Sequence, residues 1–383
     1  MKITKDILYV GVDDHQIDLF EGQFDVPNGM AYNSYVIMDE KIAVMDSVDA
    51  NFKDEWLNNI KEALNGKKPA YLIVSHMEPD HSANIIEFLN VYPDSIIVSN
   101  AKSFKMMEQF FGKNISNRIE IKDGDLLNLG KHQLKFYAAP MVHWPEVMLS
   151  YDECDKVLFA ADAFGKFGAN DYDDPEGWAC EARRYYFGIV GKYGAQVQAV
   201  LKKLAGVPIE HICSLHGPVL SENLEYYLDT YDTWSKYEAE TKGVFIAYAS
   251  AYGNTAKAAK MLAEKLEKEG LKVAIADLAR EDLHESIEDA FRYDRIVLAT
   301  ITYNGSIFPI MDHFINELLE RGYQNKKIGI IENGSWAPMA AKVIQNKFEK
   351  SKNITFVEPF VKILSAPNQE TEKAIDLLVN NLK

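Results

Sequence analysis

The segment His76-Met77-Glu78-Pro79-Asp80-His81 places four potential metal ligands within six residues. It follows the apolar run Tyr71-Leu72-Ile73-Val74, which is predicted to form a buried strand. Imidazole and carboxylate groups gathered at a strand end are typical of a metal site. The sequence therefore predicts that this strand end binds metal.

Three further potential ligands also follow apolar runs. His143 follows residues 134–142, Asp162 follows residues 157–161, and His216 follows residues 212–215. Strand ends on one edge of a layered fold converge, so we expect all of these groups to share one site. The predicted ligands are His76, Glu78, Asp80, His81, His143, Asp162 and His216.

The number and type of these donors indicate which metal they hold. Four imidazoles and three carboxylates are too many for one tetrahedral zinc ion, but they suit two ions that share a bridging carboxylate. Two divalent cations (+4) and three carboxylates (−3) leave a charge of +1, which a bridging hydroxide neutralises. This hard oxygen and nitrogen shell favours non-haem iron or manganese over zinc or copper.

A second chemical signal lies in the loop Ala247-Tyr248-Ala249-Ser250-Ala251-Tyr252-Gly253-Asn254-Thr255, between a predicted strand and a predicted helix. Hydroxyl groups, a glycine and free backbone N–H groups at a helix N-terminus can hold a phosphate dianion. The loop has no lysine of the Walker type, so ATP hydrolysis is not indicated.

Two later loops, residues 300–305 and 332–336, follow the third and fourth strands of the same region and suit a flat ring. In a flavodoxin-like strand order, such loops surround the switch point where FMN binds. The predicted cofactor-binding residues are Ser250, Tyr252, Gly253, Asn254, Thr255, Thr302, Tyr303, Asn304, Gly305, Asn333, Gly334, Ser335 and Trp336.

The elements that position the metal ligands are predicted to form two sheets with outer helices, an α/β/β/α arrangement. Short, partly alternating apolar runs before residue 50 indicate antiparallel strands. The later predicted strands are 71–75, 95–99, 134–139, 147–151, 157–161 and one near 212. The predicted helices are 52–64, 82–89, 102–111 and 226–240, with a helical region at 178–204.

Beyond residue 241 the pattern becomes a regular alternation of strands and helices, which predicts one doubly wound parallel sheet. The predicted strands are 244–249, 272–276, 295–299, 327–331 and 355–361. The predicted helices are 254–269, 284–291, 309–320, 337–349 and 370–382. We place the domain boundary between 241 and 242, so that the chain is an α/β multidomain protein with domains 1–241 and 242–383.

Composition limits the remaining possibilities. A chain of 383 residues is expected to form two domains, and its net charge of −16 disfavours binding to nucleic acid or an anionic membrane. Three cysteines without C-x-x-C spacing, Cys154, Cys180 and Cys213, are predicted to be reduced structural thiols. The remaining histidines are predicted to be ordinary core or surface residues: His15, His132, His211, His284 and His313.

The N-terminal residues show no signal peptide, and no apolar stretch reaches the length of a membrane span. We therefore predict a cytoplasmic protein. Two residues near the metal ligands have more than one interpretation. Asp46 is either an acceptor for a ligating histidine or a turn or cap residue, and Trp144 is either a wall of the site or ordinary core.

The pattern H-x-[EH]-x-D-H with distant His, Asp and His resembles the metallo-β-lactamase superfamily. Its zinc hydrolases usually have histidine where this chain has Glu78. That replacement, together with the second domain, resembles the flavodiiron proteins, also called A-type flavoproteins. The resemblance implies that His76, Glu78 and His143 hold one iron ion, that Asp80, His81 and His216 hold the other, and that Asp162 bridges them.

The S-x-Y-G-N-T loop resembles the phosphate loop of flavodoxins, with Tyr252 where threonine is common. This resemblance implies that Ser250, Tyr252, Asn254 and Thr255 hold the phosphate. It also implies that residues 303–305 face the pyrimidine side of the ring. Trp336 either covers one ring face or belongs to the core. One departure from the family is Glu21, at a position where many members have histidine.

By the same resemblance the chain is a reductase of O₂ to water, of NO to N₂O, or of both, with FMN and an oxo- or hydroxo-bridged diiron centre as cofactors. Family members form head-to-tail dimers, so we expect a homodimer or a dimer of dimers. A rubredoxin-like protein is the expected electron donor, and a reduced deazaflavin is the second choice. The alternative is a binuclear zinc hydrolase fused to a flavodoxin-like electron-transfer domain.

Overall fold

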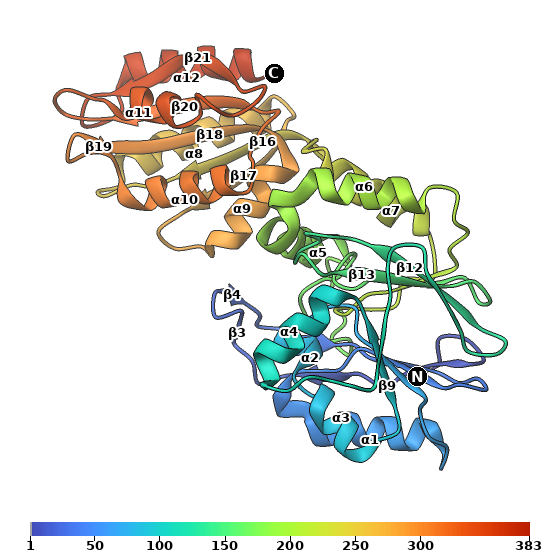
Figure 1. The fold of residues 1–383 in the computed structure, drawn as a ribbon. Coiled ribbons are helices and arrows are strands. Elements are labelled where there is room, and N and C mark those ends of the chain that lie inside the picture. The colour runs from blue at the N-terminus through green and yellow to red at the C-terminus, as the bar shows by residue number, and fades with distance from the viewer. Residues whose placement is uncertain (1) are drawn as a thin grey trace. The chain divides into compact units, whose positions relative to one another are not determined.

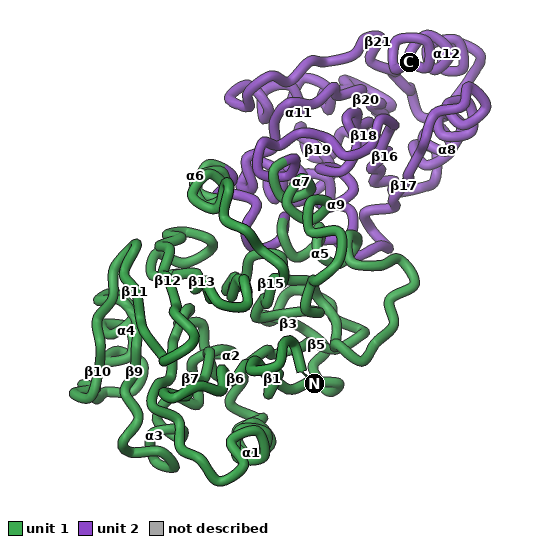
Figure 2. The backbone as a smooth tube through the Cα atoms, turned by 90° about the vertical axis from the view of Figure 1, so that its right-hand side faces the viewer, with its two compact units in different colours: residues 1–186, 195–232 green, residues 187–194, 233–383 purple. Residues whose placement is uncertain are grey.

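The structure, a computed structural model, describes residues 2–383, which form two compact units (Figure 2). The first unit consists of residues up to 186 together with 195–232, and the second of residues 187–194 and 233–383. The first strand of the second unit's sheet begins at Thr241. The domain boundary between 241 and 242 stays a prediction.

The first unit contains two main sheets. The first sheet has the order β1-β6-β7-β8-β9-β10, with β1 (Ile7–Tyr9), β6 (Tyr35–Ile37), β7 (Ala43–Met45), β8 (Tyr71–Ile73), β9 (Ile96–Ser99) and β10 (Arg118–Glu120). The second has the order β11-β12-β13-β14-β15, with β11 (Leu126–Asn128), β12 (Gln133–Ala138), β13 (Met148–Asp152), β14 (Val157–Phe159) and β15 (His211–Cys213). Two short ribbons pair β2 (Val12–Asp14) with β5 (Met30–Tyr32), and β3 (Leu19–Phe20) with β4 (Phe24–Asp25).

The two sheets pack face to face. Ile37 and Ile73 of the first sheet share one apolar core with Phe136 and Phe159 of the second. Helices α1 (Lys53–Leu64) and α3 (Ile85–Val91) lie outside the first sheet, and α6 (Gly194–Leu204) and α7 (Leu224–Ser235) lie outside the second (Figure 1). The predicted α/β/β/α arrangement is confirmed.

Helix α1 shows why these helices lie against the sheets. Its buried residues Trp56, Ile60 and Leu64 are spaced four apart and therefore share one face. A short 3₁₀ turn, η1 (Ala50–Phe52), precedes the helix, and the Asp49 side chain caps it by accepting a hydrogen bond from the N–H of Asn51. Helix α4 (Ala101–Phe111) buries Phe104 and Met107 in the same manner.

Three helices predicted between residues 82 and 240 have different bounds in the structure. The predicted helix 82–89 is two helices, α2 (Pro79–Ser82) and α3, because the fixed φ of Pro79 starts a helical turn earlier. The region 178–204 is divided into α5 (Ala179–Tyr185), a π turn (Tyr186–Val190), a 3₁₀ turn (Gly191–Tyr193) and α6. The predicted helix 226–240 is α7, which ends at Ser235, since Tyr237 adopts a left-handed φ of 58°.

The second unit has a parallel sheet in the order β17-β16-β18-β20-β21. Its strands are β16 (Thr241–Tyr248), β17 (Lys272–Asp277), β18 (Tyr293–Tyr303), β20 (Lys327–Asn333) and β21 (Thr355–Ile363), and β19 (Ser306–Ile307) forms a hairpin with β18. The helices are α8 (Asn254–Lys268), α9 (Leu283–Arg292), α10 (Pro309–Glu320), α11 (Ala340–Lys347) and α12 (Gln369–Leu382). The predicted doubly wound fold is confirmed.

Both faces of this sheet are covered. Val244 and Ile246 of β16 pack into a core with α8 and α12, whereas Phe245 points to the other face and contacts Phe314 of α10. This alternation follows from the pleat of the strand. Among residues 2–383, no helix combines the length and apolarity that a membrane span requires.

Candidate metal centre and flavin site

The structure brings all seven predicted metal ligands together in the first unit. His76 and Glu78 follow β8, Asp80 and His81 lie on α2, and the other three follow β12, β14 and β15. All seven side chains are buried. Because α2 begins at Pro79, the hexapeptide turns sharply, so that its donors fall into two different groups.

The first group consists of His76, Glu78, His143 and Asp162. Nε2 of His143 lies 3.0 Å from both Glu78 Oε2 and Asp162 Oδ2. Nε2 of His76 lies 3.2 Å from the same Glu78 oxygen and 3.3 Å from Nε2 of His143. All four donor atoms therefore face one small volume.

The second group consists of Asp80, His81 and His216. Nε2 of His81 lies 3.0 Å from Nε2 of His216 and 3.1 Å from Asp80 Oδ2. His216 Nε2 completes the triangle at 3.4 Å from the same oxygen.

Asp162 connects the two groups. Its Oδ2 atom faces the first group, at 3.3 Å from His76 Nε2, and its Oδ1 atom faces the second, at 3.5 Å from His81 Nε2 and 3.9 Å from His216 Nε2. A carboxylate in this position can bind one cation through each oxygen.

The electrostatics of the cluster show how strongly its charges depend on one another. Burial lowers the pKa of His143, but Asp162 and Glu78 outweigh burial and raise this pKa to about 9. The pKa of His76 is raised well above its ordinary value in the same way. Burial raises the pKa of Asp162, yet His76, His143 and His81 together hold it well below its usual range. These buried carboxylates stay ionised only if protonated imidazoles or metal ions supply neighbouring positive charge.

The cluster also contains polar atoms that the protein leaves unsatisfied. Both carboxylate oxygens of Asp80 and the Oδ1 atom of Asp162 are buried without a hydrogen-bond partner. The short distances between donors are those expected around cations with bonds of about 2.0–2.2 Å to nitrogen and oxygen. The donor set therefore fits two metal ions.

Glu146, which is not among the residues predicted from the sequence, positions one of the ligands. Its Oε1 atom accepts hydrogen bonds from His76 Nδ1 at 2.8 Å and from the N–H of Met77 at 2.9 Å. Burial raises the pKa of Glu146, but the hydrogen bond and charge of His76 lower it more. The sequence feature that could have indicated Glu146 is its position three residues after the predicted ligand His143.

Asp46 does not contact a histidine ring in this way. Its Oδ1 atom accepts a hydrogen bond from the N–H of Ser75 at 2.6 Å and so fixes the chain just before His76. Burial raises the pKa of Asp46 to about 6. The cap of the following turn is Asp49, so the cap interpretation of Asp46 is also wrong.

Aromatic side chains surround the two groups. The Trp144 ring stands edge-on to His76 with centroids 5.2 Å apart, as expected for a wall of the site. Phe20 and Tyr185 each lie 5.4 Å from the His216 ring. The Tyr185 hydroxyl is buried without a hydrogen-bond partner, and burial together with Asp162 raises its pKa well above the ordinary value. The sequence offered no signal for Tyr185.

Two further contacts complete the surroundings. His216 Nδ1 donates to the carbonyl oxygen of Ala31 at 2.7 Å, which leaves Nε2 with its lone pair towards the cluster. Although the Glu21 side chain is exposed, desolvation and the neighbouring Glu78 carboxylate raise the pKa of Glu21 to about 7. Glu21 therefore lies beside the first group, where many members of the resembled family have histidine.

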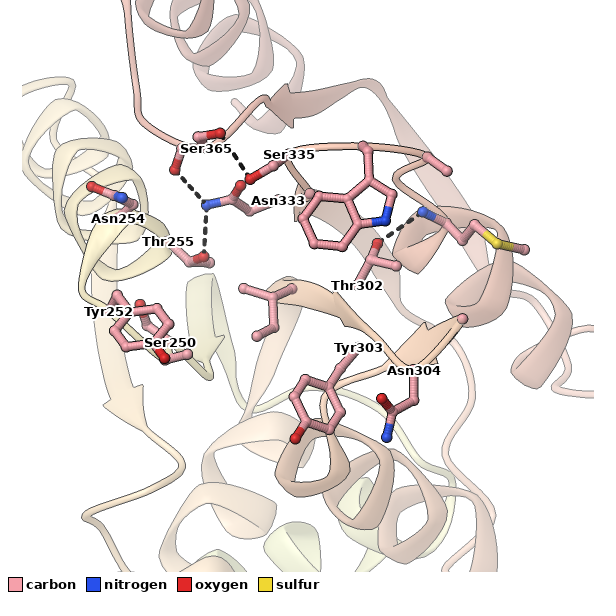
Figure 3. A pocket seen from close by; sticks show the side chains of 17 residues that line it. Ser250, Tyr252, Asn254, Thr255, Thr302, Tyr303, Asn304, Asn333, Ser335 and Ser365 are labelled. Atoms are coloured by element: carbon pink, nitrogen blue, oxygen red, sulfur yellow. Dashed lines mark hydrogen bonds between the residues drawn. The ribbon is translucent and has the colours of Figure 1, made fainter.

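The predicted flavin residues line a cavity of 590 Å³ in the second unit (Figure 3). All of them contribute to its lining except Gly253, which is the N-cap of α8 and donates its N–H to Ser250 Oγ. Figure 3 shows side chains from the ends of several strands around one central space. Ala251 and Ile301 also line the cavity and lie in the predicted loops, although they were not among the predicted cofactor-binding residues. Ala337, Met339 and Ser365 lie outside those loops and were not predicted.

Hydrogen bonds connect the loops of this cavity. Asn333 Nδ2 donates to Thr255 Oγ1 at 3.3 Å and to the carbonyl of Ser365 at 3.2 Å, and Ser365 Oγ donates to Ser335 Oγ at 2.8 Å. These hydrogen bonds connect the segments at the carboxyl ends of β16, β20 and β21 (Figure 3). Because Ser365 follows β21, only the folded sheet places it here.

Aromatic rings lie exposed at the edge of this cavity. The exposed fractions are 97% for Tyr252, 83% for Trp336 and 45% for Tyr303, so the core interpretation of Trp336 is wrong. The cavity lies at the carboxyl ends of β16 and β18, the switch point of a flavodoxin-like sheet. Flat apolar rings beside a helix N-terminus fit a flavin with a phosphate group.

Family comparisons agree with both units. The family described as "ODP family beta lactamase" matches residues 30–217, and the family described as "Flavodoxin domain" matches residues 245–359. The two matches occur in the order predicted from the sequence.

Individual relatives are similar over most of the chain. An uncharacterised protein of Methanocaldococcus jannaschii is 30% identical, over 82% of this chain and 80% of its own length. A nitric oxide reductase of Moorella thermoacetica is 27% identical, over 96% and 94%. The solved rubredoxin:oxygen oxidoreductase of Desulfovibrio gigas has a TM-score of 0.91 at 26% identity, with 100% and 97% covered. This chain spans only 59% of the length of a similar putative diflavin flavoprotein from Synechocystis.

Proposed function

Because the chain belongs to the flavodiiron protein family, we propose that it reduces O₂ to water, NO to N₂O, or both, with electrons that pass through FMN to a non-haem diiron centre. The observation that carries this proposal is the position of Asp162. Its two oxygens face two separate groups of buried donors, in the same chain as a flavin-type cavity.

In this proposal His76, Glu78 and His143 hold one iron ion, and Asp80, His81 and His216 hold the other. Asp162 would lie between the two ions, with one carboxylate oxygen towards each group of donors. When bound, a pair of ferrous ions supplies two electrons at once to a small molecule. The chain fixes the ligands for that task, since the Glu146 carboxylate orients His76 and the Ala31 carbonyl orients His216.

The second unit's cavity is proposed to bind FMN. Ser250, Asn254 and Thr255 surround the N-terminus of α8, where N–H groups and the helix dipole favour the phosphate dianion. Tyr303 and Trp336 offer ring faces to the flavin. Bound there in its reduced form, FMN would supply two further electrons, so that both cofactors together would hold the four electrons that reduction of O₂ with four protons to two waters requires.

The walls of the metal centre favour small apolar gases. Phe20, Tyr185 and Trp144 present ring surfaces to the ligating imidazoles, which excludes bulk water from the donors. The buried Tyr185 hydroxyl has no hydrogen-bond partner, and its ring lies 5.4 Å from the ring of the proposed ligand His216.

We further propose that the protein works in the cytoplasm as a homodimer or a dimer of dimers. Rubredoxin is the proposed electron donor, because the D. gigas relative is named for rubredoxin and oxygen. A reduced deazaflavin is the second choice. Titration of the oxidised protein with each reduced donor, followed by flavin absorbance, distinguishes the two.

The test of this function is an anaerobic assay with each gas. The purified protein is analysed for iron and FMN, reduced chemically, and mixed with O₂ or NO while gas consumption and N₂O are recorded. We expect two iron ions and one FMN per chain and rapid turnover of at least one gas. The outcome that favours the fused zinc hydrolase is a protein that contains zinc and no iron. Such a protein would consume neither gas and would hydrolyse esters or lactams.

A further inference from the structure

A polar cluster outside both proposed sites joins three separate segments of the first unit. Asp6 precedes β1, His132 precedes β12, and Cys154 and Asp155 lie in the turn between β13 and β14. One nitrogen of His132, the thiol of Cys154 and one oxygen of Asp155 all lie within 4.8 Å of one another. His132 Nε2 lies 3.5 Å from Asp6 Oδ2.

The ring of His132 is held in an orientation that suits a metal ligand. Its Nδ1 atom lies 3.0 Å from Asp152 Oδ2, and because a carboxylate only accepts, Nδ1 carries the proton of the neutral ring. Asp152 is itself fixed, since the N–H of Asp155 donates to the same oxygen at 2.8 Å. A histidine that binds metal usually donates its other N–H to a carboxylate in this way.

The opposite nitrogen of His132 makes no hydrogen bond, although it lies 3.5 Å from an oxygen of Asp6. Nε2 is buried without a hydrogen bond, and His132 as a whole is 0% exposed. In the neutral ring this atom carries a lone pair that points towards the Asp6 carboxylate. Two electron-rich atoms repel one another at this distance unless a proton or a metal ion lies between them. Burial lowers the pKa of His132, but Asp152, Asp155 and Asp6 raise it more, so a proton and a metal ion compete for this position.

We propose that Asp6, His132, Cys154 and Asp155 form a structural site for a divalent zinc-type ion. One imidazole, one thiolate and two carboxylates supply the four donors of a tetrahedral zinc site. Binding forms the metal–sulfur bond and releases the thiol proton of Cys154 to solvent. The ion would hold the segment before β1 against the β11–β12 and β13–β14 connections, so it would stabilise the edge of the sandwich.

A lysine neutralises the same carboxylates when no metal is bound. Lys131 Nζ lies 2.7 Å from Asp6 Oδ2 and 3.9 Å from Asp155 Oδ1, and Thr4 Oγ1 donates to Asp155 Oδ2 at 2.5 Å. The Lys131 side chain is 55% exposed and can turn into solvent when a cation enters. Lys131 therefore competes with the metal.

The test uses the full protein with its iron and FMN in place and Co²⁺ as the probe. A cobalt–thiolate bond gives a charge-transfer band in the near ultraviolet, which is recorded as a difference spectrum against the cobalt-free protein. The proposed diiron ligands contain no cysteine, so the band reports only a thiolate site. We expect the band in the wild type and its competition by Zn²⁺.

Four variants make the assignment specific. Cys154→Ser should abolish the band, and Asp152→Asn should weaken Co²⁺ binding about 10- to 100-fold. His132→Gln should weaken it further, whereas Lys131→Gln should strengthen it. Unchanged iron and FMN contents establish that each variant is folded, and Cys154, which is partly exposed, is the substitution least harmful to packing.

Two results would overturn the proposal. One is the absence of any thiolate band at saturating Co²⁺ in the folded wild type. The other is a band that persists in Cys154→Ser, or that does not respond to Lys131→Gln. The first result means that His132 is protonated and simply joins the Asp152 and Asp6 carboxylates as an ion pair. The second means that the cobalt ion binds elsewhere, for example at Cys180.

Discussion

Individual side chains at the metal cluster divide into donors and the groups that orient them, and only the donors have a clear sequence signature. The spacing of His76, Glu78, Asp80 and His81 on one strand end predicts them directly. Glu146 accepts a hydrogen bond from His76, which lies 70 positions away in the sequence. Tyr185 is the last residue of α5, where the α-helix changes to a π turn. Such contacts depend on packing and carry no local pattern.

The role of Glu146 can be tested by removing its acceptor. Glu146→Ala leaves His76 Nδ1 and the N–H of Met77 without their partner, so we expect iron affinity to fall about 10- to 100-fold. Glu146→Gln keeps an acceptor oxygen and should restore most of the loss. Iron is quantified after dialysis against a graded chelator.

The matched control for this substitution is Glu153→Ala, an exposed carboxylate on the neighbouring turn, which should retain full iron. If Glu146→Ala binds iron as tightly as the wild type, Glu146 does not position His76. Equal losses in the Ala and Gln variants would show that the charge matters and not the acceptor geometry.

At the scale of elements, the sequence predicted the second unit better than the first. Long strands and helices with caps, such as α12 with its Asn368 capping box, have strong periodic and terminal signals. The first unit uses strands of three to six residues in its two main sheets, and helices whose ends depend on single backbone angles. The left-handed Tyr237 just after α7, where the two units meet in the sequence, is a similar case, because no rule favours tyrosine in that conformation.

The N-terminus of α8 gives a prediction at this scale. Gly253 has a φ of 85°, a conformation that costs an L-residue about 1–2 kcal/mol. Gly253→Ala should therefore distort the phosphate cradle and weaken FMN binding about 5- to 30-fold, with iron content unchanged. FMN affinity is measured by fluorescence titration of the flavin-depleted protein.

Gly270, at the other end of α8, is a closely matched control. Its φ is 81°, and like Gly253 it has no atom within 4 Å of an added Cβ. Gly270→Ala should lower thermal stability by a similar amount without changing FMN affinity. If both variants bind FMN equally, the α8 N-terminus is not the phosphate site.

Lys326 connects the start of β20 with the end of α9 and should make the second unit sensitive to pH. Its buried Nζ donates to the carbonyl oxygens of Phe291 at 2.5 Å and Tyr293 at 2.8 Å, which uses the two N–H bonds of a neutral amine. Burial lowers its pKa from 10.5 to about 7. The unfolded chain therefore binds more protons than the folded chain between these two pH values.

The sign of the effect follows from this difference. The stability contribution is fully present above pH 10.5 and is lost as the pH falls to about 7, with a slope of at most about 1.4 kcal/mol per pH unit. Lys326→Met should flatten this part of the profile, and Lys327→Met, at an exposed neighbour, should not. The free energy of unfolding of each protein is measured at a series of pH values by urea unfolding followed by FMN fluorescence. If stability changes with pH in the same way in the wild type and both variants, Lys326 is protonated in the folded chain.

At the scale of the whole molecule, the proposed reaction needs the flavin and the irons to exchange electrons. Sequence patterns predicted the two folds and their order along the chain, because each fold has its own internal periodicity. They could not predict the path of electrons between two cofactors bound to different units, since that path depends on how the chains assemble. The proposed homodimer assigns it to neighbouring chains, with FMN of one beside the irons of the other.

Mixing two inactive variants tests this route. Asp162→Asn removes the anionic bridge and should lose iron but keep FMN, whereas Ser250→Asp places a negative charge at the phosphate cradle and should lose FMN but keep iron. If electrons cross between chains, reassorted dimers contain one complete pair of cofactors in half of the population. Activity should then recover to about a quarter of the wild-type value. Differently tagged chains establish that mixed dimers form; if they form and no activity returns, electrons pass within each chain and the head-to-tail arrangement is wrong.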